Sequence, residues 1–306
     1  MRLLITGASG LLGLNLALEY THQHHIVIGQ IGRNALHGVP FQTIQTDLTA
    51  PGALPALLEA SRPQIVIHCA ALANLEACER DPQQAHRLNA EIPAQLAALC
   101  QKGGARLLHV STDAVFDGVR GNYREDDTPN PLSVYAYSKL AGEQAVAAAN
   151  PHAIIARVNL FGFSLTGKRS LAEFFINNLS AGQRVNGFTD VYFCPLLVNR
   201  IAHLFNAMLT RDLHGLYHVF AADCLSKYQF GVEIAQRFGF ASSLITPISV
   251  EDGNLQAARA PNLTMNTQKL ESALGSPPPR VRDMLEDLHS LWVRGYPLRL
   301  QQYLNQ

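Results

Sequence analysis

The stretch "RLLITGASGLLG", residues 2–13, decides the fold. Its first five residues form a short apolar run that predicts a buried strand, and residues 11–20 predict the helix that follows. Between them lie Gly7, Gly10 and Gly13, whose missing side chains allow a tight turn and a close approach of the backbone to an anion. Free N–H groups and the helix dipole favour that anion at the start of the helix. The stretch therefore predicts a dinucleotide-binding turn; an ordinary structural turn is the alternative.

Short apolar runs and helix patterns alternate through the first half of the chain. Such alternation is typical of crossover units that build a parallel sheet. The expected fold class is therefore α/β, a doubly wound parallel sheet of the Rossmann type. Pro93 is expected to interrupt or bend the longest helix. The further predicted strands are 24–29, 41–47, 63–71, 105–113 and 152–158, and the predicted helices are 51–62, 81–103 and 131–143.

The strict alternation ends near residue 160, which predicts a change of domain. We expect residues 1–160, joined by about 194–221, to form an NAD(P)-binding Rossmann domain. Residues 161–193 and 222–306 are expected to form a smaller C-terminal lobe that binds the substrate.

Composition indicates a globular protein and excludes some partners. The 306 residues are 47% hydrophobic and 16% charged, and 24 basic residues balance 24 acidic ones. A formal net charge of zero argues against nucleic acid or an anionic membrane as partner of the whole chain. The sequence contains no run of 18 apolar residues and no signal-sequence pattern, so we expect no membrane association and a cytoplasmic location.

Five cysteines are present, an odd number without a C-x-x-C pair. Several lie in apolar runs such as "IVIHCAAL", residues 65–72. We therefore expect reduced, buried thiols throughout. The cysteines are Cys69, Cys78, Cys100, Cys194 and Cys224.

The segment "THQHH" places His22, His24 and His25 close together. No cysteine or carboxylate is spaced with them as a further ligand, and they lie in the connection between the first helix and the second strand. We therefore expect turn histidines and no metal site.

The end of the second predicted strand bears on the choice of cofactor. The segment "IVIGQIGRN", residues 26–34, lacks the acidic residue that would bind the adenosine ribose hydroxyls. Arg33 lies 20 residues after Gly13, and its guanidinium suits a 2′-phosphate. This favours NADP(H), with NAD(H) left open. Asp47, after the third strand, is expected to bind the adenine amino group, with a turn or cap role as the alternative.

The stretch "PLSVYAYSKLAGE", residues 131–143, contains two tyrosines shortly before a lysine. In a helix, residues four apart lie on one face, so Tyr135 and Lys139 share a stripe, whereas Tyr137 points away. A free phenol has a pKa near 10. We expect the Lys139 ammonium, with a positively charged nicotinamide nearby, to lower the pKa of Tyr135 so that the phenol exchanges a proton with a carbonyl oxygen.

Ser111 and Thr112 end the fifth predicted strand, within "HVSTDAVFDG", residues 109–118. Ligands of open parallel sheets bind at the carboxyl ends of the strands. Thr112 is therefore expected to donate a hydrogen bond to the same carbonyl oxygen, and capping of a turn is the alternative.

Together these motifs resemble the extended short-chain dehydrogenase/reductase family and, within it, the dTDP-4-dehydrorhamnose reductases. The resemblance covers nearly the whole chain. It rests on "TGASGLLG", "IVIHCAAL", "STDAVFDG", "YAYSKLAGE", "RVNLFG" and "RAPNLTMNTQKL". It implies an NADP(H)-dependent reductase of a nucleotide-linked 4-keto-6-deoxy sugar, and a homodimer stays open.

The resemblance also implies roles for particular residues. Thr112, Tyr135 and Lys139 would form the catalytic triad, and Lys139 would bind the nicotinamide ribose as well. The other implied cofactor-binding residues are Gly7, Ser9, Gly10, Leu11, Leu12, Gly13, Arg33, Asp47, Leu48, Ala70, Ala71 and Tyr135. The implied substrate-binding residues are Thr112, Asp113, Phe116, Asn159 and Arg259, the last of which would hold a diphosphate.

The sequence departs from this family pattern at one segment, and two alternative functions stay open. Rhamnose-pathway reductases tend to carry an R-T-S-W segment near the sugar, and residues 157–160 here read Arg-Val-Asn-Leu. "IGQIGR" and "FTDVYFCPLLVNRIA" also resemble the regulatory β subunit of methionine adenosyltransferase, which implies an NADP-binding protein that acts on a partner enzyme. An epimerase or dehydratase with permanently bound NAD is disfavoured by the missing acidic residue after the second strand.

Overall fold

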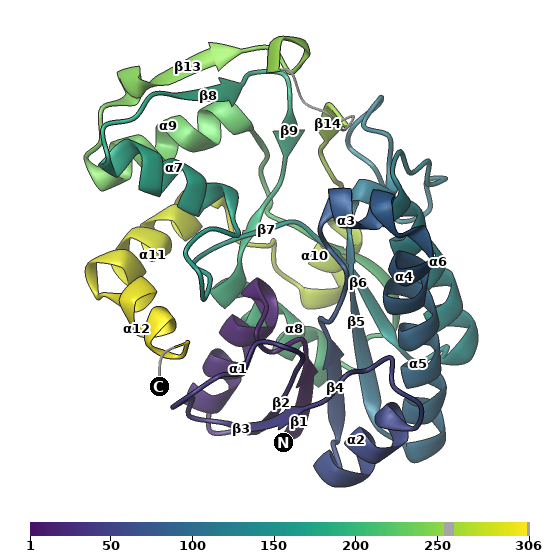
Figure 1. Cartoon of the computed structure of the whole chain (residues 1–306). Helices are drawn as coiled ribbons and strands as arrows, with labels where there is room; N and C mark the ends of the chain where they lie inside the picture. The colour runs from purple at the N-terminus through teal and green to yellow at the C-terminus, as the bar shows by residue number, and fades with distance from the viewer. Residues whose placement is uncertain (254–259, 305–306) are drawn as a thin grey trace.

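A seven-stranded parallel sheet forms the centre of the protein (Figure 1). This computed structural model describes residues 1–253 and 260–304. The strands run side by side in the order β11-β6-β5-β4-β1-β2-β3, and every pairing is parallel. The doubly wound α/β fold expected from the sequence is thereby confirmed. The strands are β1 (Arg2–Thr6), β2 (Ile26–Ile31), β3 (Gln42–Gln45), β4 (Ile65–His68), β5 (Arg106–Thr112), β6 (Ile154–Val158) and β11 (Gly215–Val219).

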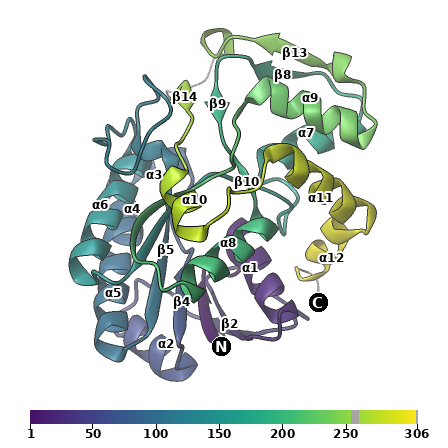
Figure 2. The ribbon, with the colours of Figure 1, turned by 180° about the vertical axis from the view of Figure 1, so that it is seen from behind.

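Helices cover both faces of the sheet (Figures 1 and 2). Alternate strand residues point to opposite faces, so the inner strands contribute to two separate apolar clusters. One cluster packs under α2 (Ala53–Ser61), α5 (Ile92–Gly103) and α6 (Val134–Ala149). The other packs under α1 (Leu11–His22) and α8 (Val198–Thr210). Burial on both faces explains the continuous apolar runs of the sequence.

A second group of elements lies beyond the carboxyl ends of the strands. Strands β8 and β13 pair in parallel, and β9 lies between β12 and β14 in a three-stranded sheet. Among the described residues no helix is both long and apolar enough to cross a bilayer. These elements are β7 (Leu160–Phe161), α7 (Leu171–Ser180), β8 (Val185–Phe188), β9 (Tyr192–Phe193), β10 (Leu196–Leu197), β12 (Leu225–Ser226), α9 (Lys227–Phe238), η3 (Ser242–Leu244), β13 (Ile245–Ile248), η4 (Glu251–Gly253) and β14 (Asn262–Leu263).

The last helices return to the main sheet. They are α10 (Gln268–Leu274), α11 (Val281–Val293) and α12 (Tyr296–Gln302). The Tyr296 hydroxyl donates to Asn15 Oδ1 of α1 at 2.8 Å, and the His37 amide donates to the Tyr303 carbonyl at 2.9 Å. The C-terminal segment therefore joins the two groups of elements.

The expected irregularity before Pro93 is present as a π-helical turn. Helix α3 (Leu75–Arg80) is followed by α4 (Pro82–His86), the π-turn η1 (Arg87–Glu91) and α5. Proline has no N–H, so it cannot donate to the Asn89 carbonyl as an ordinary helix residue would. Helix α6 approaches closely here: a Cβ built on Gly142 would lie 2.1 Å from the Asn89 oxygen. The π-turn thus sets where the tyrosine-bearing helix lies.

Replacing Gly142 with alanine should destabilise the protein by about 1–3 kcal/mol, because the new methyl group forces α6 away from the π-turn. Glycine-to-alanine changes inside helices ordinarily stabilise by about 1 kcal/mol. Gly103→Ala is the matched control, since its Cβ would meet no atom within 4 Å. Urea unfolding of both variants checks this, and equal stabilities would contradict the close approach.

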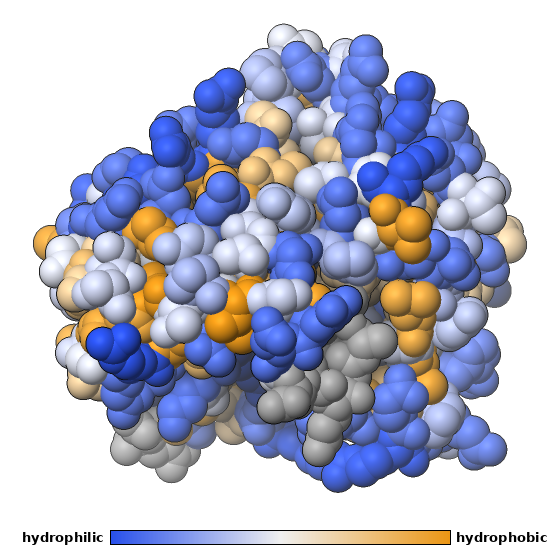
Figure 3. Space-filling view, turned by 90° about the horizontal axis from the view of Figure 1, so that it is seen from above, coloured by the Kyte–Doolittle hydropathy of each residue, from blue (hydrophilic) through white to orange (hydrophobic). Residues whose placement is uncertain are grey.

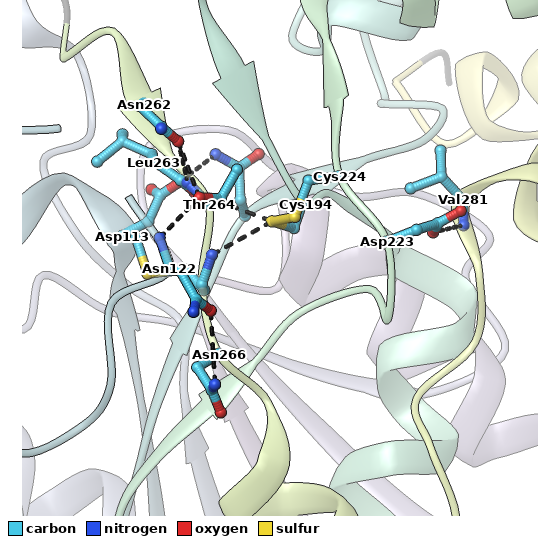
Figure 4. Close-up of a disulfide and its surroundings, with 12 residues drawn as sticks. Asp113, Asn122, Cys194, Asp223, Cys224, Asn262, Leu263, Thr264, Asn266 and Val281 are labelled. Atoms are coloured by element: carbon cyan, nitrogen blue, oxygen red, sulfur yellow. Dashed lines mark hydrogen bonds between the residues drawn. A yellow bond between two sulfur atoms is a disulfide. The ribbon is translucent and has the colours of Figure 1, made fainter. Parts of the chain in front are cut away.

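Cys194 and Cys224 form a disulfide, so the expectation of reduced thiols throughout is wrong for this pair. The antiparallel pairing of β9 with β12 matches Phe193 with Leu225, which sets the two cysteines opposite each other despite a sequence separation of 30. Figure 4 shows the bridge beside the β14 segment, where the Met265 amide donates to the Cys194 sulfur at 3.4 Å. The other three, Cys69, Cys78 and Cys100, are free thiols, as expected.

Alkylation of the unreduced, unfolded chain should therefore label three of its five cysteines. Reduction should expose all five and lower the free energy of unfolding by about 3–4 kcal/mol, from the loop entropy that the bridge removes. Peptide mass mapping counts the labels and identifies the bridged pair. Five labels without reductant would contradict the bridge.

Candidate active site

A cavity of about 730 Å³ lies at the carboxyl ends of four neighbouring strands, β4, β1, β2 and β3. This position is where the strand order reverses and where open α/β sheets bind ligands. Eight residues predicted to bind a cofactor line it, and the other five do not, namely Leu11, Leu12, Gly13, Tyr135 and Lys139. The eight are Gly7, Ser9, Gly10, Arg33, Asp47, Leu48, Ala70 and Ala71.

The glycine turn is compact for steric reasons. Gly7 has a φ of 68°, in the left-handed region, and a Cβ on it would lie 2.9 Å from the Ala70 backbone. A Cβ on Gly13 would lie 2.3 Å from the Gly7 oxygen, so Gly13 packs α1 against the turn. Gly10 is the N-cap of α1 and offers no side-chain cap, which leaves the first N–H groups of the helix free for an anion.

Gln30 supports this turn and was missed in the sequence. Its Oε1 accepts from the Gly7 amide at 3.0 Å, and its Nε2 donates to the Thr46 carbonyl at 2.8 Å. It therefore joins the glycine turn to the segment after β3. The sequence pattern of this part of β2 indicated only that an acidic residue is missing there, and it did not single out Gln30.

Two arginines reach the cavity from different parts of the chain. Arg33 is exposed and lines it after β2, and Arg169 lines it from the segment before α7. No sequence signal pointed to Arg169, because it lies more than a hundred residues from the glycine turn. Asp47 also lines the cavity, while its Oδ1 accepts from the Thr49 amide at 2.9 Å and from the Thr49 hydroxyl at 2.8 Å. These hydrogen bonds lower the pKa of Asp47, so the turn role is present.

Helix α6 presents the predicted tyrosine and lysine to the sheet. Its N-cap, Ser133, accepts from the Ala136 amide at 3.3 Å and fixes the start of the helix. Lys139 is 3% exposed, and its Nζ donates to the Val110 carbonyl of β5 at 2.7 Å, whereas Tyr137 is 59% exposed. The sequence-based separation of the two tyrosine faces is therefore confirmed.

The ionisation of the pair differs from the sequence-based expectation. Burial raises the pKa of Tyr135 to about 12, against the lowering effect of the Thr112 hydroxyl, and Asp113 raises it further. Burial lowers the pKa of Lys139 to about 8, and the Glu143 carboxylate opposes that change. The expected lowering of the tyrosine pKa is wrong for the protein by itself, because burial raises it and the opposing effect comes from Thr112, not from Lys139. At neutral pH the phenol is protonated and the lysine is mostly charged.

A polar group at the end of β5 lies beside Tyr135. The Thr112 hydroxyl donates to Asp113 Oδ1 at 3.1 Å and accepts from the Ala114 amide at 3.2 Å. Asn159 Nδ2 donates to Asp113 Oδ2 at 2.6 Å. Burial raises the pKa of Asp113 to about 6, although these hydrogen bonds oppose the change. Thr112 therefore caps a turn, and its hydroxyl also lowers the pKa of the Tyr135 phenol.

A second cavity, of about 140 Å³, lies between this polar group and the strands beside the disulfide. Phe116 and Asn159, both predicted to bind substrate, line it together with Ser133 and Phe193. Lys227 also lines it, a cation that the sequence did not single out, and its charge lowers the pKa of Asp113. Arg259 lies outside the described residues. The face of the molecule seen from above is mainly hydrophilic, with apolar side chains in separate groups (Figure 3).

Of the clustered histidines, His22 ends α1, and His24 and His25 lie in the connection to β2. Met1 places its amino group 3.3 Å from His25 Nδ1, and burial lowers the pKa of His25. Within residues 1–253 and 260–304, no three His, Cys, Asp or Glu side chains gather so that they could hold a metal ion.

Comparison with known proteins gives a consistent relationship. Residues 1–291 match the family described as the RmlD substrate binding domain. The chain is 32% identical to the probable low-salt glycan biosynthesis reductase Agl14 of Haloferax volcanii, over 94% of this chain and 96% of that one. It is 30% identical to methionine adenosyltransferase 2 subunit beta of Danio rerio, over 88% and 84%. The structure of dTDP-4-dehydrorhamnose reductase from Bacillus anthracis in complex with NADP matches with a TM-score of 0.81 and 26% identity, over 94% and 98%.

Proposed function

The chain belongs to the family of the RmlD substrate binding domain, and from that premise we propose that it is an NADP(H)-dependent reductase of a nucleotide-linked 4-keto-6-deoxy sugar. The observation that carries the proposal is the position of Tyr135, Lys139 and Thr112 at the same sheet edge as the glycine-turn cavity. Similar proteins named as reductases support the proposal: the probable reductase of Haloferax volcanii and the Bacillus anthracis dTDP-4-dehydrorhamnose reductase in complex with NADP.

The residues around the larger cavity suit a dinucleotide phosphate. Free N–H groups at the start of α1 would bind the pyrophosphate, and Ala70 and Ala71 would line its path. Arg33 and Arg169 supply positive charge where a 2′-phosphate needs it, and β2 ends without a carboxylate. NADP(H) is therefore preferred over NAD(H), in agreement with the NADP complex of the Bacillus anthracis reductase. Once bound, the cofactor would supply the hydride.

The protein would supply the proton and stabilise the oxygen. Tyr135 keeps its phenolic proton at neutral pH and would give it to the sugar oxygen as that oxygen gains negative charge. The Thr112 hydroxyl would donate a hydrogen bond to the same oxygen. The Lys139 ammonium, which donates a hydrogen bond to the Val110 carbonyl, would stabilise the phenolate that forms when Tyr135 gives up its proton.

We assign the sugar to the smaller cavity. Asp113 and Asn159 would bind sugar hydroxyls, Phe116 would form an apolar wall, and Lys227 would attract the diphosphate. In this scheme residues 1–160 and about 194–221 bind the cofactor. Residues 161–193 and 222–306 close over the nucleotide sugar.

Tyr135→Phe should lower kcat by at least about 10²-fold and leave NADPH binding within about twofold, because only the proton donor is removed. NADPH oxidation at 340 nm with a panel of nucleotide 4-keto-6-deoxy sugars, including dTDP-4-dehydrorhamnose, gives the rate. Tyr137→Phe, on the exposed face of the same helix, is the control and should keep full activity. Wild-type turnover in the Tyr135 variant would refute the mechanism.

Arg33→Ala should raise the Kd of NADPH about tenfold or more and change that of NADH less than twofold, because the lost hydrogen bonds serve the 2′-phosphate alone. Arg169→Ala tests the second cation in the same way. Arg184→Ala, at an exposed position before β8, is the control. Fluorescence titration measures all of these, and equal losses for both cofactors would overturn the assignment.

The similarity to methionine adenosyltransferase 2 subunit beta supports a second candidate, a regulatory NADP-binding subunit. Such a protein would bind NADPH, copurify with a partner enzyme and turn over no sugar in the panel. An epimerase or dehydratase with retained NAD is less favoured, because the described residues place Arg33, and no carboxylate, after β2.

A further inference from the structure

A third ionisable residue continues the stripe of Tyr135 and Lys139 on α6. Glu143 lies one turn beyond the lysine and is only 5% exposed. A carboxylate buried to this degree is costly unless other groups satisfy it. Its partners therefore show what it does.

Glu143 accepts hydrogen bonds from side chains of two strands, Ser111 of β5 and Arg157 of β6. The Ser111 hydroxyl of β5 donates to Oε1 at 2.5 Å. Arg157 of β6 donates through Nε to Oε1 at 2.9 Å and through Nη2 to Oε2 at 2.7 Å, which is the bidentate geometry that favours an ionised carboxylate. The negative charge is thus fixed between the helix and the sheet.

Arg157 is fixed in turn. It is 2% exposed, and its guanidinium lies 5.0 Å from the centre of the Phe116 ring. Its Nη1 lies 3.3 Å from His218 Nε2 on β11. The register pairs Ser111 with Arg157 and Arg157 with His218, so one polar row crosses three strands beneath α6.

The groups that face Lys139 come from three elements. Glu143 lies on α6, His68 and Cys69 lie at the end of β4, and His109 lies on β5. Burial lowers the pKa of His68 to about 3 and that of His109 well below its usual value, and it raises the pKa of the Cys69 thiol to about 12. All three are therefore neutral at neutral pH, and among the described groups around the lysine Glu143 carries the opposing charge.

We propose that Glu143, anchored by Ser111 and Arg157, is a positioning residue that keeps Lys139 charged and seated against β5. Glu143 acts through the lysine and touches neither cofactor nor sugar in this scheme. The effect of Glu143 on turnover rests on the proposed reductase function. The electrostatic part can be tested without any substrate.

The test is a pH titration of Lys139 by NMR in the full chain labelled with ¹³C at lysine Cε. The chain has five lysines, so the signals can be assigned, with Lys139→Met identifying the one of interest. In Glu143→Gln, which keeps size and acceptor oxygen but removes the charge, the midpoint should fall by about one pH unit from its wild-type value near 8. Because the loss of the Glu143 anion disfavours the charged form of Lys139, the midpoint must move to lower pH.

Glu233→Gln is the matched control, because Glu233 is also ion-paired with arginine but lies on α9. It should leave the Lys139 midpoint unchanged. If Glu143→Gln fails to fold, Glu143→Leu/Arg157→Met removes both buried charges together and should still lower the midpoint, because Glu143, one turn from the lysine, is the member of the pair that raises the pKa of Lys139. In the folded variant, kcat at pH 8 should fall several-fold at an unchanged KM.

A midpoint that stays within about 0.3 pH units in the Glu143 variants would overturn the inference, and the pair would then be structural only. That result is independent of the proposed function, which fails instead if no sugar of the panel is reduced. A shifted midpoint without any turnover would support the inference and reject the reductase.

Discussion

The buried ion pair between Glu143 and Arg157 determines how α6 meets the sheet. It joins the helix to β5 through Ser111 and to β6 directly, and His218 extends the contact to β11. Breaking such a pair leaves an uncompensated charge in the interior and costs about 3–5 kcal/mol. The interaction therefore fixes the rotation of the helix that carries Tyr135 and Lys139, and with it the geometry of the candidate active site.

The π-turn before Pro93 contacts a neighbouring face of the same helix, about 100° around its axis from the face of Glu143. Gly142 lets α6 approach the Asn89 carbonyl, while Asn89 Nδ2 donates to the Ser138 hydroxyl at 2.9 Å. Helix α6 is thus held on one face by a steric fit and on a neighbouring face by charge. This rigidity suits a proton donor on α6, since proton transfer needs the donor within hydrogen-bonding distance of its target.

Local patterns were enough to predict the parallel sheet and the glycine turn. They also indicated which tyrosine faces the sheet, because helix periodicity separates Tyr135 from Tyr137 without tertiary information. Other features arise from contacts between distant segments, so no local pattern pointed to them. These are the positions of Gln30, Arg169 and Lys227 in the cavities and the Cys194–Cys224 bridge. The sign of the Tyr135 pKa shift was also missed, because the depth of burial sets it and sequence does not reveal that depth.

The most direct test of the account follows the fate of the transferred hydrogen. NADPH carrying deuterium at both C4 positions would be incubated with the protein and dTDP-4-dehydrorhamnose, and the product analysed by NMR. The account predicts one deuterium at the sugar carbon that carried the keto group, and incorporation slower by at least about 10²-fold when Tyr135 is replaced by phenylalanine. A product without deuterium at that carbon, or an unchanged sugar while NADPH binds normally, would contradict it.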